Sequence, residues 1–499
     1  MSKRPGRIRR LFSGAAASAL TFWKRGTLAT FTLLLKTKTT SLAVGPFVVM
    51  MGQVSKIELA KGGEEAKLKL ARLAGVGASA LDIAYEHDND AVAKDLATAA
   101  MGMLIDAIKA EHKPTVEGFS RTFVKGLLKP RGNPKYKKKV DELVDERRRM
   151  FNEALVHEKN GTRPEGDNPP TADELAMVAT SLLVAAVDLQ IDAMEEAEST
   201  GYLGMVHYFS GSWVEALEQG IRDGCELRVR SIVGDRTNAF SKAMKEEWKE
   251  GGNGEAEILS EAAVEVLLRA VEHEKRDLVE IFSESWVEAL ERAINDKQDL
   301  KARVEAMVNR RTAAFVKALG QGAGEATTLS GAGVAVLLSA IKKGNAKLIL
   351  SLSRSWVKAL NAKGVRYGPQ VAPLIELRTN EFNKAIATRD VEQAKILSKA
   401  GMAVLLAAVE DGSDSLVHGL SDSWVSALGR AITQFEGDAA TRDEVVAEAV
   451  NFGKGLIEGG VSRKLLEDGR SAIMRSAADE RYKGVADLVN ENWKLVFSD

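Results

Sequence analysis

The chain has 499 residues, of which 45% are hydrophobic and 28% charged, so it is long enough for several domains or one extended array. The 69 basic and 70 acidic side chains nearly cancel, but residues 1–57 contain ten Lys or Arg and no acid. The remaining residues therefore carry 59 basic and 70 acidic side chains, a net charge of −11. This balance argues against a general nucleic-acid-binding body, which is normally strongly basic.

Cysteine and proline usage narrows the class of protein further. Cys225 is the only cysteine, which excludes an intrachain disulfide and a thiolate metal site within one chain. Such usage favours a reducing intracellular compartment. No proline lies between Thr171 and Gly368 or after Pro373. Long proline-free text rich in Ala and Leu favours helices.

Residues 1–57 form a basic, acid-free N-terminal arm. The longest charge-free run, Thr39–Ser55, has 17 residues interrupted by Gly45 and Pro46, which is short for a membrane-spanning helix of roughly 20 residues. Three interpretations stay open: an organellar import sequence, a secretion or membrane-surface segment, and a flexible basic tail. Delivery into a host cell is one form of the second.

A single motif recurs along the rest of the chain. Texts such as SGSWVEAL, SESWVEAL, SRSWVKAL and SDSWVSAL return at intervals of about 70 residues, the mark of a repeat architecture. A looser copy, NENWKLVF, ends the series, and an earlier copy has Phe in the Trp place. The aromatic residues of these copies are Phe123, Trp213, Trp286, Trp356, Trp424 and Trp493.

Each repeat is predicted to contain three helices. A short first helix ends about fifteen residues before the aromatic residue, and turns such as Lys342–Asn345 follow it with Gly in a C-cap role. The second helix places Leu278, Phe282 and Trp286 on one apolar face. A third helix follows, marked by a Phe in texts such as RRTAAFVKAL. One such unit cannot bury its apolar face alone, so neighbours must stack.

The predicted fold class is therefore all-α, an α-solenoid of about five three-helix repeats with a C-terminal half repeat. The architecture resembles that of HEAT, armadillo and ankyrin arrays as a class of shape; no stretch matches their consensus motifs, so no functional residue carries over. The predicted boundaries are 1–57 for the arm, 58–95 for capping helices, then repeats at 96–172, 173–256, 257–326, 327–394 and 395–466, and a half repeat or cap at 467–499. A polar Pro/Gly-rich stretch, Val156–Ala172, interrupts the array as a predicted exposed loop or hinge.

The aromatic column is predicted to be structural. Each Trp has Leu or another apolar residue one turn before and after it, which favours a core anchor over a base-stacking platform. The serines before each Trp, such as Ser283 and Ser285, are expected to bond to helix carbonyls one turn earlier.

Basic residues also recur on the third helix. A stacked array would align them into a ladder that could bind an acidic partner, a phosphate backbone or anionic lipid, although pairing with carboxylates of the next repeat explains them more simply. The candidate partner-binding residues are Arg147, Arg236, Arg311, Arg378, Lys242, Lys317, Lys384 and Lys454. Glu448 replaces the Arg in the fifth repeat.

Nothing in the sequence predicts catalysis. The six histidines are scattered, and there is no HExxH, phosphate-binding loop or dinucleotide fingerprint, so we expect no catalytic residue, cofactor or metal. The favoured function is a non-enzymatic scaffold that binds another macromolecule, most simply a protein, and could act as a delivered effector or a particle component. The alternative is nucleic-acid or anionic-membrane binding through residues 1–57 and the ladder. An enzyme with a site at the 156–172 insert is a third hypothesis.

Overall fold

The computed structural model describes residues 52–53, 55–60, single positions between 66 and 85, and then 90–162, 169–195, 201–250, 254–296, 298–321, 323–434, 439–458 and 460–497. The predicted N-terminal arm thus lies almost wholly outside the described residues. Within the described part every regular element is a helix and no strand is present.

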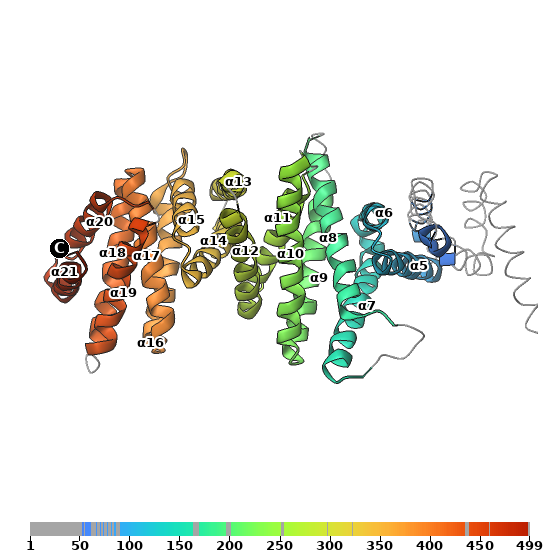
Figure 1. The fold of residues 1–499 in the computed structure, drawn as a ribbon, viewed down its shortest axis with the longest axis horizontal. Coiled ribbons are helices and arrows are strands. Elements are labelled where there is room, and N and C mark those ends of the chain that lie inside the picture. The colour runs from blue at the N-terminus through green and yellow to red at the C-terminus, as the bar shows by residue number, and fades with distance from the viewer. Residues whose placement is uncertain are drawn as a thin grey trace, which may run out of the picture. The chain divides into compact units, whose positions relative to one another are not determined.

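Most helices follow one another with short connections (Figure 1), and longer connections follow Lys159 and Leu360. They are α5 (Asp90–Lys109), α6 (Lys113–Gly132), α7 (Pro134–Lys159), α8 (Ala172–Glu195), α9 (Tyr202–Arg222), α10 (Glu226–Glu250), α11 (Glu255–Glu272), α12 (Arg276–Asp296), α13 (Gln298–Gln321), α14 (Ala323–Lys343), α15 (Ala346–Leu360), α16 (Ala372–Ala387), α17 (Val391–Asp411), α18 (Asp414–Gln434), α19 (Ala439–Glu458), α20 (Arg463–Ser476) and α21 (Lys483–Phe497). A π-helical turn, Tyr367–Val371, precedes α16, and a 3-10 turn, Glu480–Tyr482, precedes α21.

This order confirms the predicted helical-repeat fold. The triplets α5–α7, α8–α10, α11–α13, α14–α16 and α17–α19 each place the repeated aromatic residue on the middle helix, and α20–α21 form the half repeat. Two details of the prediction were wrong. The first helix of a repeat is not short, since α11 already has 18 residues and α8 has 24. The interrupting loop is shorter than 156–172, because α7 continues to Lys159 before it begins.

The turn between the first two helices of a repeat has a left-handed residue at a fixed position. Gly344 and Gly412, twelve residues before the aromatic residue of their repeats, have φ of 73° and 72°, as a C-cap glycine requires. Two other repeats place Glu111 and Glu274 at the same position, with φ of 51° and 55°. The left-handed backbone conformation is therefore kept in repeats that have Glu in place of the favourable Gly.

The described residues divide into two compact units. Unit 1 comprises those up to Ile232 with Val264–Arg269, and unit 2 comprises those of Val233–Ala263 and from Ala270 onward. In unit 1, α8 packs against α5, α6, α7 and α9. In unit 2 the helices from α12 to α21 pack mostly on the next helix and the next but one, so that the apolar core runs between successive repeats.

The outer face of α21 differs from the matching face of the internal repeats. In α12, Ser283 and Val287 are four residues apart and so share one face, and Ser283 meets Ser339 of α14 at 2.8 Å. The Val at this position is 0–1% exposed in all four copies, Val214, Val287, Val357 and Val425. In α21 the two positions are occupied by Asn490 and Lys494, and Lys494 is exposed. This face is polar, as in a capping unit.

Candidate functional site

The aromatic column lies in the core. Phe123, Trp213, Trp286, Trp424 and Trp493 are 6–8% exposed, and Trp356 is half-buried. Middle and third helices meet through these rings, as where the Phe151 and Trp213 centroids lie 5.0 Å apart. The Trp424 indole N–H donates to the Ser398 carbonyl at 3.3 Å. None of the five buried rings presents a face to solvent for stacking on a ligand.

The four arginines of the proposed ladder are partly buried, and Arg147, Arg311 and Arg378 make contacts inside their own repeats. Arg311 of α13 forms an ion pair with Glu261 of α11, and their side chains are 20% and 23% exposed. Arg378 bonds to Glu381 one turn along α16 at 2.7 Å. The Arg147 guanidinium lies over the Phe123 ring, 4.6 Å from its centroid, and burial lowers its pKa to about 10. Arg236 is half-buried on α10. We expected each ladder arginine to pair with a carboxylate of the next repeat. The partner of Arg311 belongs instead to the same repeat.

The fifth repeat contains the same pair with its polarity reversed. Glu448 occupies the Arg311 position of its repeat, and Lys399 occupies the Glu261 position, 25 residues before the Trp. Their charged groups are 2.6 Å apart. The exchange of charge on both partners indicates that this pair joins the first and third helices in the third and fifth repeats.

The lysines of the ladder lie on a different face from the arginines. Lys242, Lys317, Lys384 and Lys454 are exposed. Lys242, Lys317 and Lys384 follow the Arg of their repeat by six residues, and Lys454 follows Glu448 by six. This spacing turns the two positions about a third of a circle apart around the helix axis. Lys242 pairs with Glu246 at 3.6 Å, and Lys454 donates to the Val496 carbonyl near the end of α21 at 3.0 Å. The structure therefore does not bring the two sets together into one stripe.

The serine columns join neighbouring repeats. The hydroxyl just before the Trp meets a threonine on the third helix of the preceding repeat in three successive pairs, Thr237–Ser285, Thr312–Ser355 and Thr379–Ser423. The back-bonding expected of these serines is also present, as in Ser283 to the Glu280 carbonyl at 3.0 Å. Sequence reasoning missed the threonines, although each directly follows the repeated Arg in DRTNAF, RRTAAF and LRTNEF.

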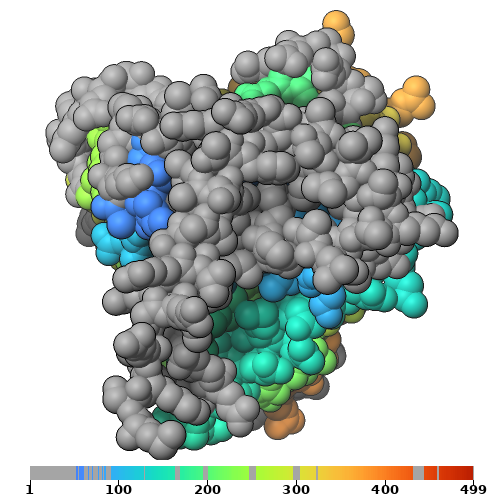
Figure 2. All heavy atoms as spheres, turned by 90° about the vertical axis from the view of Figure 1, so that its right-hand side faces the viewer, coloured from blue at the N-terminus to red at the C-terminus, as the bar shows by residue number. Residues whose placement is uncertain are grey.

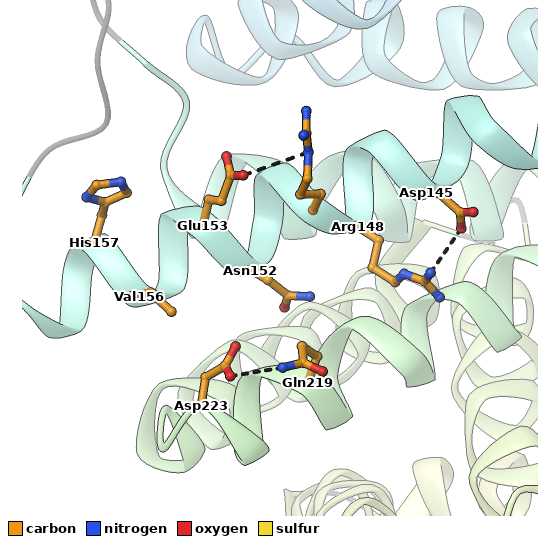
Figure 3. A pocket seen from close by; sticks show the side chains of 9 residues that line it. Asp145, Arg148, Asn152, Glu153, Val156, His157, Gln219 and Asp223 are labelled. Atoms are coloured by element: carbon orange, nitrogen blue, oxygen red, sulfur yellow. Dashed lines mark hydrogen bonds and ion pairs between the residues drawn. The ribbon is translucent and has the colours of Figure 1, made fainter.

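An open groove of about 440 Å³ lies in unit 1 between α7 and the end of α9 (Figure 3). Most of its lining side chains are charged or polar, and they come from the stretch Asp145–His157 of α7 and from the C-terminal end of α9. They are Asp145, Arg148, Arg149, Asn152, Glu153, Val156, His157, Gln219 and Asp223. The repeat pattern did not predict this site, because its residues have no fixed counterpart in the other repeats.

Ion pairs and a hydrogen bond fix side chains within each wall of the groove. Arg149 bonds to Glu146 at 2.7 Å and lies 3.8 Å from Glu153. On the opposite wall the Gln219 side-chain amide donates to Asp223 at 2.9 Å. The Asn152 side chain projects between the two walls, and its buried Oδ1 has no hydrogen-bond partner in the structure (Figure 3). A buried acceptor without a partner costs free energy, which a donor on a bound molecule would recover.

The groove borders the loop between α7 and α8. His157, at its edge, pairs through Nδ1 with the Thr162 hydroxyl at 2.8 Å, at the start of the loop that leads to α8. The far end of that loop is tied back, since the Ala172 backbone N–H donates to Glu158 at 2.8 Å. The mixed charges and the single apolar lining residue, Val156, suit a polar, charged surface better than an apolar small molecule.

Other candidate chemistry is not assembled in the described part of the chain. The described residues contain no group of three or more His, Cys, Asp or Glu able to hold a metal ion. Cys225 is 4% exposed, and burial raises the pKa of its thiol, which keeps it protonated and a poor nucleophile.

Two described helices are apolar and long enough to cross a membrane by length and composition, Ala172–Met194 in α8 and Gly324–Lys343 in α14. Half of each apolar window is buried within the protein. Asp188 and Asp192 of α8 also pair with Arg121 of α6. These features are those of core helices, which pass the same test.

No protein-family model matches the sequence, and comparison with curated proteins finds no match. Among solved structures, one described as "Circular tandem repeat protein with novel repeat topology and enhanced subunit contact surfaces" is similar over 90% of this chain and 99% of its own, at 15% identity and a TM-score of 0.30. A likeness of that size establishes no shared fold or function. The repeat architecture follows from the helices of this chain alone.

Proposed function

We propose that this helical-repeat protein is a non-enzymatic scaffold and that the groove between α7 and α9 binds a protein partner. One observation carries the proposal: the groove combines paired charges of both signs with a buried, unpartnered Asn152 oxygen. A partner chain supplies backbone and side-chain donors for such an oxygen and charged groups for the rim. A role as a delivered effector or a particle component is compatible with the same site.

The ladder supports this proposal less well than the groove. Its arginines are partly buried, Arg311 and Arg378 pair within their own repeats, and its lysines lie on another face of their helices. The alternative partner, nucleic acid or anionic lipid bound through residues 1–57, stays a prediction because that arm lies outside the described residues.

The proposal is tested by photo-crosslinking of the full-length chain in extract of its source cells. A benzoylphenylalanine replaces Glu153, which is 59% exposed at the groove, and in a matched control it replaces the exposed Lys317 of α13. We expect one discrete protein adduct from position 153, absent from position 317 and lost when Arg149→Ala is added. Equal adducts from both positions would remove the groove as the site, and an adduct sensitive to nuclease would favour the alternative.

Deleting residues 163–168 separates the enzyme hypothesis from the scaffold. If the insert is only a hinge, the crosslink from position 153 is retained. Turnover of a substrate that the deletion abolishes would instead support a catalytic site at the insert.

A further inference from the structure

The corner between α6 and α7 concentrates positive charge on a chain whose body is acidic. From Gly118 to Val140 there are eight Lys or Arg and no acid. The side chains that form the basic corner, as named here, are Lys125, Arg131, Lys135, Lys137, Lys138 and Lys139. Arg131 and Lys139 are half-buried and the other four are exposed. The corner belongs to unit 1, parts of which are visible as blue to teal spheres in Figure 2.

The turn that makes the corner is tight and rigid. Only Asn133 separates α6 from α7; its backbone N–H donates to the Pro130 carbonyl at 3.1 Å, and its side chain accepts from the Lys135 backbone N–H at 3.0 Å. Pro130 and Pro134 restrict the chain on either side. The basic side chains are thus presented from a fixed platform.

The first turn of α7 has basic residues where helices usually favour acidic ones. The first turn of this 26-residue helix contains no acid, and lysines stand there although a helix N-terminus carries partial positive charge. Such a placement costs stability in the free protein. An external anion at the corner would relieve it.

An exposed leucine borders the basic corner. The start of α9 lies against the end of α6, since a Cβ added at Gly201 would lie 3.0 Å from Leu128 Cδ1, and one added at Gly204 would lie 3.9 Å from Arg131 Nη1. Leu203, between these glycines, is 49% exposed. The exposed leucine is thus next in sequence to a residue that lies beside Arg131 of the corner. Basic and apolar side chains together are the combination that binds the interface of an anionic bilayer.

Nucleic acid fits the corner less well than a membrane. Beyond Val140 the exposed side of α7 turns acidic at Glu142, Asp145 and Glu146, which would repel a duplex lying along the helix but not a plane that touches only the corner. Tyr136, the aromatic residue within the basic run, is 8% exposed and packs against Tyr85 with centroids 5.7 Å apart. It offers no face for base stacking.

We propose that the basic corner, with Leu203, docks the protein on an anionic lipid surface. This inference is independent of the groove and of residues 1–57. It predicts that partner binding and membrane docking occupy separate surfaces of unit 1.

The test uses the full-length chain and vesicles of phosphatidylserine with phosphatidylcholine, or of phosphatidylcholine alone. The corner variant carries Lys135→Gln, Lys137→Gln and Lys138→Gln, and the control carries Lys347→Gln, Lys358→Gln and Lys464→Gln, which remove equal charge at exposed sites outside both the corner and the ladder. Three lysines near an anionic surface contribute roughly 100-fold in partitioning, at about fivefold each. We expect the corner variant, and not the control, to lose about that much binding to the mixed vesicles.

Leu203→Gln supplies a second readout, because it should weaken vesicle binding without changing its salt dependence. Equal binding of the corner and control variants to mixed vesicles overturns the proposal, as does equal binding to both vesicle types. If a DNA duplex, and no vesicle, is bound in a way that depends on the corner, the site is a nucleic-acid site and the lipid proposal is wrong. Circular dichroism melting of both variants checks that each is folded.

Discussion

Individual positions in this chain can be compared with their own copies. The Trp column tolerates small differences in depth, from 6% exposed at Trp424 to half-buried at Trp356, while the residue after each internal Trp is a valine with almost no exposure. The copies thus provide internal controls that a non-repetitive protein lacks.

Trp286→Ala should lower the free energy of unfolding by about 3–5 kcal/mol, because it leaves a cavity where a buried aromatic ring was. Trp286 is 7% exposed, so little of the loss can be recovered by solvent. Urea unfolding followed by circular dichroism measures the change. An unaltered midpoint would mean that the ring is not part of the core.

Arg311→Glu should destabilise the protein by roughly 1–2 kcal/mol, because it removes a partly buried ion pair and places two acids together. Adding Glu261→Lys should restore most of the loss, since the double variant copies the polarity of the Glu448–Lys399 pair. A double-mutant cycle in urea measures the coupling. Strictly additive effects would show that the pair does not join the two helices.

At the scale of the element, the repeated sequence motif predicted the helices and their order. It did not predict the lengths of the helices or all of their packing partners. Apolar periodicity locates the middle helix because its face is buried in every copy. It could not locate the ends of the first helix, which are set by packing on the preceding repeat, as α8 packs on α5 and α6. The groove was not predictable, because Asn152 and Gln219 meet only after α7 and α9 pack together.

Glu274→Gly should stabilise the protein by about 1 kcal/mol, because the left-handed conformation costs a non-glycine residue roughly 1–2 kcal/mol. The φ of Glu274 is 55°, and the equivalent position is Gly344 or Gly412 in later repeats. Thermal melting measures the gain. As the control, Gly412→Ala should lower Tm, and a rise in Tm there would contradict the explanation.

Two glycines in one column should respond oppositely to alanine. A Cβ at Gly401 would lie 2.6 Å from Trp424 Cδ1, so Gly401→Ala should cost about 1–3 kcal/mol through overpacking. A Cβ at Gly333 would lie 3.7 Å from Trp356 Cδ1, an ordinary contact, so Gly333→Ala should gain up to about 1 kcal/mol in helix propensity. Thermal melting of the two variants measures both effects. A change of Tm with the same sign in both would be inconsistent with this packing.

For the whole molecule, the uneven charge is the main property visible in the sequence. Composition predicted an acidic body and a basic arm, and the described residues add a second basic feature at the α6–α7 corner. The net charge of the body did not reveal this corner, because acidic residues elsewhere in the body outnumber its lysines.

Asn490→Ser with Lys494→Val should make the protein self-associate, because it gives α21 the face that internal repeats bury. Sedimentation velocity over a range of concentrations measures the effect, with Lys483→Gln as a control for lost charge. A variant that sediments like the natural chain would show that an apolar α21 face does not cause self-association.

The reversed ion pair has a consequence for how the chain finds its fold. Near-identical repeats invite a helix to dock in the wrong unit, a characteristic error of repeat proteins. If α17 took the place of α11, Lys399 would face Arg311, and in the opposite exchange Glu261 would face Glu448. Each mistaken pairing brings like charges together. The signs of the charges in the two ion pairs therefore favour docking of each first helix in its own repeat, the third or the fifth.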